Sequence, residues 1–194
     1  MIAQLTGKYL HKTPTKVIVD INGLGYEVHI SLNTYTAISQ LQQGTLFTYL
    51  KVSEDALTLF GFFEDGEKEV FLKLINVSGV GAATARMMVS SLKPAEIQQA
   101  IASNNVKLLE SIKGIGKKTA ERIVLELRDK IGVIATTATT GAPAHNTTSS
   151  EALEAMMALG IGKPLAEQAI RKALAQSADD FTVEELIKLA LKSL

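Results

Sequence analysis

KGIGKKTAER occupies residues 113–122, and a weaker copy, SGVGAATARM, occupies residues 78–87. At an offset of 35 positions, the glycines, the aliphatic residue between them and a Thr-Ala pair coincide. Apolar positions upstream and downstream of these motifs coincide as well. The internal repeat predicts that each copy is an apolar helix, a glycine turn and a second helix.

The two glycines of each copy flank one aliphatic residue: Gly79, Val80 and Gly81 in the first copy, and Gly114, Ile115 and Gly116 in the second. Glycine permits left-handed backbone angles, so the pattern predicts a tight hairpin with the aliphatic side chain turned inward. Such a hairpin presents the start of its second helix, where unpaired amides and the helix dipole favour an anion. A phosphate group suits this position.

Lysines in the second copy support the phosphate interpretation. Lys117 and Lys118 lie in the first turn of the helix expected at residues 117–131, where a positive side chain opposes the helix dipole. The apolar residues of this helix recur at helical spacing, so Lys118 and Arg122 project from the opposite face. This placement is favourable when a polyanion neutralises the lysines.

Other phosphate-binding patterns fit less well. A nucleotide P-loop requires a glycine at the position of Ser111 and a Ser or Thr at the position of Lys118, so that pattern fails twice. A dinucleotide fingerprint requires a third glycine where Thr84 and Thr119 stand. The simpler alternative is a pair of ordinary helical hairpins with a solvated basic edge, and the presence of two copies argues against it.

Composition narrows the classes of protein. The 194 residues are 46% hydrophobic, which is enough for packed cores in one, two or three domains. The sequence has no cysteine, which excludes disulfides and thiolate zinc sites, and its three histidines lack ligand spacing. No apolar stretch approaches the roughly 20 residues of a membrane span, and the amino terminus does not resemble a signal peptide. These features predict a cytoplasmic protein.

Charge is distributed unevenly along the chain. The formal net charge is zero, but residues 82–130 hold nine Lys or Arg against five Asp or Glu. The part from Glu151 onward reverses this balance, with seven acids against five bases. This segregation predicts a basic face, suited to a polyanion, on an otherwise neutral or acidic particle.

Alternating apolar runs predict five strands within residues 1–63, at residues 2–10, 16–21, 26–32, 46–52 and 57–63. Asn22-Gly23 marks a hairpin turn, and a short helix is expected at residues 35–41. The arrangement predicts an oligonucleotide-binding (OB) barrel. Eight of the ten aromatic residues fall here, so stacking on single-stranded nucleic acid is an alternative, although most of these residues suit the barrel core.

Helical patterns follow the barrel, at residues 67–76, 84–92, 94–103, 106–111 and 117–131, and residues 64–131 are expected to form one domain. Residues 132–150 are rich in Thr, Ala, Ser, Gly and Pro, which is typical of a flexible linker. Residues 151–194 predict a three-helix bundle, with Ser149 or Ser150 capping the first helix and Thr182 and Glu185 forming a capping box for the third. Its many apolar residues favour a docking patch.

The repeated G-[VI]-G-x-x-T-A pattern resembles the tandem helix-hairpin-helix motif of proteins that grip DNA backbones without reading bases. With the segments NGLGYEV and VSEDALTLFGF, the whole chain resembles the RuvA family of bacterial proteins, which recognise Holliday junctions. The resemblance implies an α+β multidomain fold with an OB barrel, a tandem helix-hairpin-helix domain and a UBA-like three-helix bundle. It implies a non-catalytic DNA-binding subunit with no cofactor, catalytic residue or metal site.

The resemblance also assigns residues and partners. The residues expected to bind DNA are Gly79, Val80, Gly81, Ala82, Arg86, Gly114, Ile115, Gly116, Lys117, Lys118, Thr119 and Arg122. Acids are common in exposed turns, but here Glu54 and Asp55 match an acidic pin at the junction centre. The implied partners are Holliday junction DNA, a RuvB-type hexameric ATPase bound through residues 151–194, and a RuvC-type resolvase. The implied assembly is a homotetramer, with one or two tetramers on the DNA.

The first hairpin departs from the family pattern. Well-known relatives carry a proline and a lysine after the second glycine, where this chain has Ala82 and Ala83. The second hairpin is therefore expected to dominate binding, with Arg86 compensating in part. Two other functions stay open on these residues: a helix-hairpin-helix DNA repair enzyme, and an OB-fold single-strand-binding protein.

Overall fold

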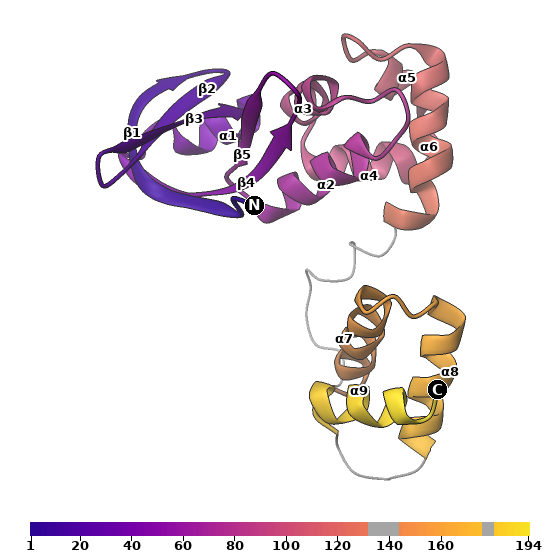
Figure 1. Cartoon of the computed structure of the whole chain (residues 1–194). Coiled ribbons are helices and arrows are strands. Elements are labelled where there is room, and N and C mark those ends of the chain that lie inside the picture. Colours follow the sequence, from indigo (N-terminus) through magenta and orange to yellow (C-terminus); the bar gives the residue numbers. More distant parts are fainter. Residues whose placement is uncertain (132–143, 176–180) are drawn as a thin grey trace. The chain divides into compact units, whose positions relative to one another are not determined.

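The computed structural model describes residues 1–131, 144–175 and 181–194, and it divides into two units, Met1–Thr137 and Ala138–Leu194 (Figure 1). The first unit contains a β-barrel followed by helices, and the second contains helices. Most of the expected linker, residues 132–143, lies outside the described residues.

Five strands in residues 1–63 close into a barrel in the order β1-β2-β3-β5-β4. They are β1 (Gln4–Thr13), β2 (Lys16–Ile21), β3 (Leu24–Ile30), β4 (Gln43–Val52) and β5 (Leu57–Phe62). All neighbours pair antiparallel except β3 and β5, which pair parallel. The OB barrel predicted from the alternating runs is confirmed.

Local sequence accounts for the connections between strands. Asn22 and Gly23 both have positive φ, 52° and 92°, as a two-residue hairpin turn requires. Helix α1 (Leu32–Ile38) begins earlier than the expected residue 35, because the Ser31 hydroxyl accepts a hydrogen bond from the Thr34 amide and caps the helix there.

The helices of the first unit are α2 (Asp65–Ile75), α3 (Ala82–Ser91), α4 (Pro94–Ala102), α5 (Val106–Glu110) and α6 (Lys117–Ile131). Their apolar faces share one core with two residues of β5, Phe60 and Phe62. The ring centroid of Phe71 on α2 lies 5.4 Å from the ring centroid of Phe60 and 4.9 Å from that of Phe62. The barrel and the helices are thus packed together, and the domain boundary expected at residue 63 stays a prediction.

A buried carboxyl group adds a polar contact at the same place. Glu67 on α2 is only 3% exposed, and its carboxylate accepts hydrogen bonds from Ser31 Oγ and, at 2.7 Å, from Thr34 Oγ1. Burial raises the pKa of Glu67, while the two hydroxyls oppose that shift. Thr34 on α1 and the cap residue Ser31 are therefore hydrogen-bonded directly to α2.

The second unit contains α7 (Ala144–Ala158), α8 (Lys163–Ala175) and α9 (Val183–Lys192). Thr182 and Glu185 form the expected capping box at the start of α9. Helix α7 begins well before the expected residue 151, so residues 144–150 are helical rather than linker, and neither Ser149 nor Ser150 caps it. The Ser- and Thr-rich composition did not predict this helical start, because each Ser or Thr lowers helix stability by only about 0.5 kcal/mol relative to Ala.

Candidate nucleic-acid interface

The two hairpins repeat one backbone geometry. Gly79 has φ 90° and Gly114 has φ 93°, the left-handed region in which glycine is favoured. The amide of the following residue closes each turn: Val80 N donates to Val77 O at 3.0 Å, and Ile115 N donates to Ile112 O at 3.0 Å. The sequence repeat is therefore also a structural repeat.

The aliphatic residue of each hairpin turns inward. Val80 is 4% exposed and Ile115 is 5% exposed, whereas the glycines on either side are exposed. A Cβ atom added at Gly81 or Gly116 would meet nothing within 4 Å, so packing within the chain does not require glycine there. What glycine provides at these two positions is a bare backbone that a ligand can approach closely.

Each hairpin leads directly into the first turn of a helix. The carbonyl of Gly81 accepts from the Ala85 amide at 2.8 Å, and that of Gly116 accepts from the Ala120 amide at 2.9 Å. In the described residues, no side chain caps α3 at Gly81. The first amides of a helix have no partner within the helix, so this turn offers donors for an anion.

Side-chain charge differs between the two hairpins. Lys117 and Lys118 are exposed in the first turn of α6, and Thr119 beside them is half-buried. At the matching positions of the first hairpin, Ala82 is 6% exposed and Ala83 is exposed. The second hairpin therefore combines amide donors with two cations, and the first has amide donors alone.

Arg122 connects the hairpins. From α6, its Nη1 donates to the carbonyl oxygen of Ser78 at 3.2 Å, just before the glycine turn of the first hairpin. Its Nε also lies 3.9 Å from Glu126 Oε1. Half of the Arg122 side chain stays exposed, so the residue can hold the hairpins together and still add positive charge.

The side chain of Arg86, on α3, contacts the barrel. Its Nη1 donates to Thr15 O and lies within 3.1 Å of His29 Nδ1, and both acceptors belong to the barrel. Nη1 of Arg86 is thus directed toward the barrel. No sequence signal indicated these contacts, because the partners are 71 and 57 positions away.

The acidic turn projects from the end of the β4–β5 hairpin. Ser53 N donates to Ala56 O at 2.9 Å, and Ser53 Oγ donates to the same oxygen at 3.0 Å. Glu54 and Asp55 are exposed between these residues. The turn is held by its ends and leaves both carboxylates in solvent.

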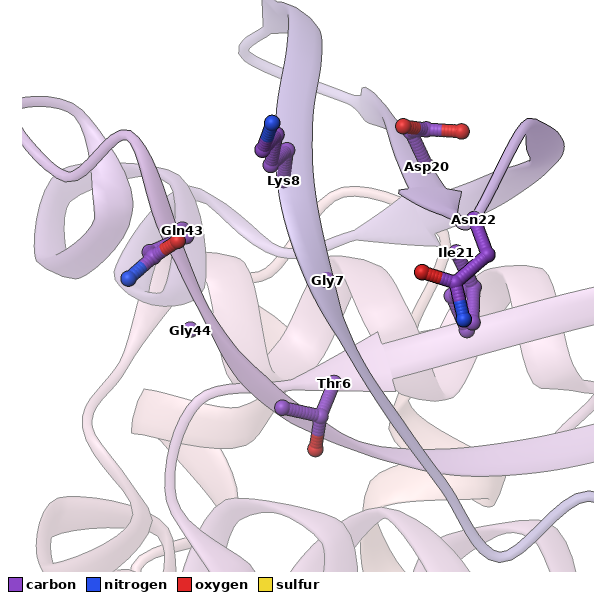
Figure 2. Close-up of a pocket in the computed structure, with 8 residues that line it drawn as sticks. All are labelled: Thr6, Gly7, Lys8, Asp20, Ile21, Asn22, Gln43 and Gly44. Carbon is purple, nitrogen blue, oxygen red and sulfur yellow. The ribbon is translucent and has the colours of Figure 1, made fainter.

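A pocket on the barrel has a volume of about 450 Å³ and lies where β1 passes from β4 to β2. Figure 2 shows its lining of Thr6, Gly7, Lys8, Asp20, Ile21, Asn22, Gln43 and Gly44, with no aromatic side chain. All ten aromatic residues fall in the described ranges, and each is buried or half-buried. This burial favours a core role for the aromatic residues over stacking on single-stranded bases.

Within the described ranges, no three His, Asp or Glu side chains gather in a way that could hold a metal ion. The same ranges contain no helix both long enough and apolar enough to cross a membrane.

Comparison with known families covers nearly the whole chain. Residues 1–61 match the RuvA N terminal domain, residues 71–129 match the SAM-like Helix-hairpin-helix tandem, and residues 147–194 match the RuvA C-terminal domain. A protein of Cytophaga hutchinsonii is 44% identical over 99% of both chains, and one of Christiangramia forsetii is 44% identical over 100% of both. Both are named Holliday junction branch migration complex subunit RuvA.

A more distant relative, from Chromobacterium violaceum, has the same name and is 41% identical over 100% of this chain and 98% of its own. Identity at this level over the full length extends through the barrel, both hairpins and the carboxyl-terminal helices. The chain belongs to the RuvA family.

Proposed function

We propose that this chain is the DNA-binding subunit of a branch-migration complex and that it binds four-way (Holliday) junctions by their shape. The observation that carries the proposal is the repeated hairpin, with matching φ at Gly79 and Gly114 and matching backbone hydrogen bonds. The shared name of its full-length relatives, Holliday junction branch migration complex subunit RuvA, supports the same function.

The proposed contact is between hairpin amides and phosphate oxygens. Such contacts fix the position of DNA and carry no base information, so binding should not depend on sequence. The residues proposed for this contact are Gly79, Val80, Gly81 and Ala82 in the first hairpin, and Gly114, Ile115, Gly116, Lys117, Lys118 and Thr119 in the second, with Arg122 between them.

The exposed carboxylates of Glu54 and Asp55 are proposed to act by repulsion. Negative charge held near the crossover disfavours the inward collapse of phosphates and so keeps the junction open. The same charge discourages a continuous duplex from passing over the turn, which provides selectivity.

The assembly is proposed to be a homotetramer, because each identical subunit can then serve one arm of the junction. A RuvB-type ATPase is proposed to dock on α7–α9, where several apolar side chains remain exposed: Met157, Leu159, Leu165, Leu191 and Leu194. ATP hydrolysis would belong to that partner, and the chain itself would be non-catalytic. We place this complex in the cytoplasm, with a RuvC-type resolvase as a further partner.

A binding titration tests the proposal. Fluorescence anisotropy would compare a labelled four-way junction, a duplex and a single strand of matched length, each made in two unrelated sequences, at fixed salt. The junction should bind most tightly, by at least about tenfold over the duplex, and the two sequences should bind equally.

The alternatives predict different results from the same titration. Preference for the single strand would support an OB-fold single-strand-binding protein, and strand cleavage or base removal with magnesium would support a repair enzyme. Either result would refute a non-catalytic junction binder.

A further inference from the structure

Arg86 ties the first hairpin to the barrel. It lies on α3, the helix that the first hairpin begins, and its Nη1 donates to the carbonyl of Thr15 in the β1–β2 turn at 3.1 Å. The same nitrogen lies 3.1 Å from Nδ1 of His29 on β3. Burial lowers the pKa of the Arg86 guanidinium, in keeping with its half-buried position.

His29 must accept in this contact. Arginine has only donors, so His29 Nδ1 presents its lone pair, and the proton of the neutral ring lies on Nε2. That nitrogen lies 3.8 Å from Glu27 Oε1, which in turn accepts from Lys16 Nζ at 2.7 Å. Burial, and next the charge of Arg86, lower the pKa of His29 and favour the neutral form.

The contact continues to the strand that carries the acidic turn. His29 pairs in register with Phe60 on β5, and the centroids of the two rings lie 5.8 Å apart. Phe60 also packs against Phe71 on α2, the helix that enters the first hairpin. Both helices of this hairpin are therefore fixed to β5, whose first residue, Leu57, follows the acidic turn.

We propose that Arg86 is a positioning residue that fixes the first hairpin relative to the acidic turn and thereby sets the preference for junctions over duplexes. The inference rests on the proposed function. A duplex can be held by the hairpins alone, whereas a junction must meet the hairpins and the acidic turn together. Arginine suits this role because Nη1 of its guanidinium carries two N–H donors, one for each acceptor.

The test measures the junction-to-duplex affinity ratio and the salt dependence of junction binding for Arg86→Met in the full-length chain. The ratio should fall about tenfold, the loss expected when hydrogen bonds to a charged group are removed. The slope of log affinity against log salt should not change, because no phosphate contact is lost. Lys118→Met is the matched control, and its slope should fall by about 0.9 while both DNA forms bind more weakly.

Two further variants separate geometry from charge. Arg86→Lys keeps the positive charge but removes the guanidinium. His29→Phe keeps an aromatic ring against Phe60 but removes the nitrogen that accepts from Arg86. Both should lower the ratio, and the loss of a hydrogen bond to the charged guanidinium should lower the thermal unfolding midpoint by only a few degrees. The double variant Arg86→Met with His29→Phe should lower the ratio no further than Arg86→Met alone, since both substitutions remove the same contact between Arg86 and His29.

A lower salt slope for Arg86→Met with an unchanged ratio would show that Arg86 contacts phosphate and would overturn the inference. An unchanged ratio and slope in all three variants would overturn it too. If the wild-type chain itself showed no preference for junctions, the proposed function would fail before the role of Arg86 was tested.

Discussion

At the scale of single residues, two hairpins with one backbone geometry carry different charges. Lys117 and Lys118 stand exposed at the start of α6, where the matching residues of α3 are Ala82 and Ala83. A lysine in the first turn of a helix is unfavourable for the helix dipole, and a bound phosphate removes that cost. The second hairpin should therefore contribute more to affinity than the first.

Charge reversal at matched positions measures this difference. Lys118→Glu replaces an attraction to phosphate with a repulsion, whereas Ala83→Glu adds only a repulsion at a weaker site. Junction affinity should fall more than tenfold further for Lys118→Glu than for Ala83→Glu, since the two changes differ by the loss of a cation. Titrations of both variants at one salt concentration would check this, and the reverse order would show that the first hairpin dominates.

Residues differ in how far the sequence alone predicts their place. The positive φ of Gly79 and Gly114 could be predicted, because glycine's freedom is a property of the residue and the motif repeats. The contacts of Arg86 could not be predicted, since its acceptors come from a turn and a strand that are distant in the chain. The same holds for Glu67, whose partners Ser31 and Thr34 meet it only in the folded protein.

At the scale of elements, strong periodicity predicted structure well and composition predicted it poorly. The bounds of α6, residues 117–131, and of β2, residues 16–21, are those expected from their apolar spacing. The predicted start of α7 was too late in the sequence, because a run of Ser, Thr and Ala was interpreted as linker. Periodicity reports burial of one face, whereas composition reports only an average tendency.

The β4–β5 turn is the element proposed to provide selectivity. Replacing Glu54 and Asp55 together by alanine should tighten duplex binding several-fold and lower the junction-to-duplex ratio, because the repulsion of phosphates is removed. The turn itself should persist, since its hydrogen bonds come from Ser53 and Ala56.

Competition between junction and duplex at fixed salt would measure this ratio. The double variant Glu54→Gln with Asp55→Asn removes the charge but keeps the size, and it should behave like the alanine variant. An unchanged ratio in both variants would remove the acidic turn from the account of selectivity.

At the scale of the whole molecule, the described residues form two packed cores in the first unit and one in the second. The barrel core and the helical core meet at Phe60, Phe62 and Phe71, so the hairpins and the acidic turn belong to one packed unit. The carboxyl-terminal helices have a separate core, built largely from alanines with Met156, Ile170 and Leu186. Such a division suits a chain that holds DNA with one unit and a partner with the other.

If the paired hairpins present main-chain amides to the DNA backbone, hydrogen exchange of those amides should slow when DNA binds. Mass spectrometry would follow exchange in the full-length protein with and without a four-way junction. Slower exchange is expected in peptides covering residues 78–84 and 113–119, with α7–α9 unchanged. Unaltered exchange in both hairpins, with protection confined to the barrel, would contradict the account.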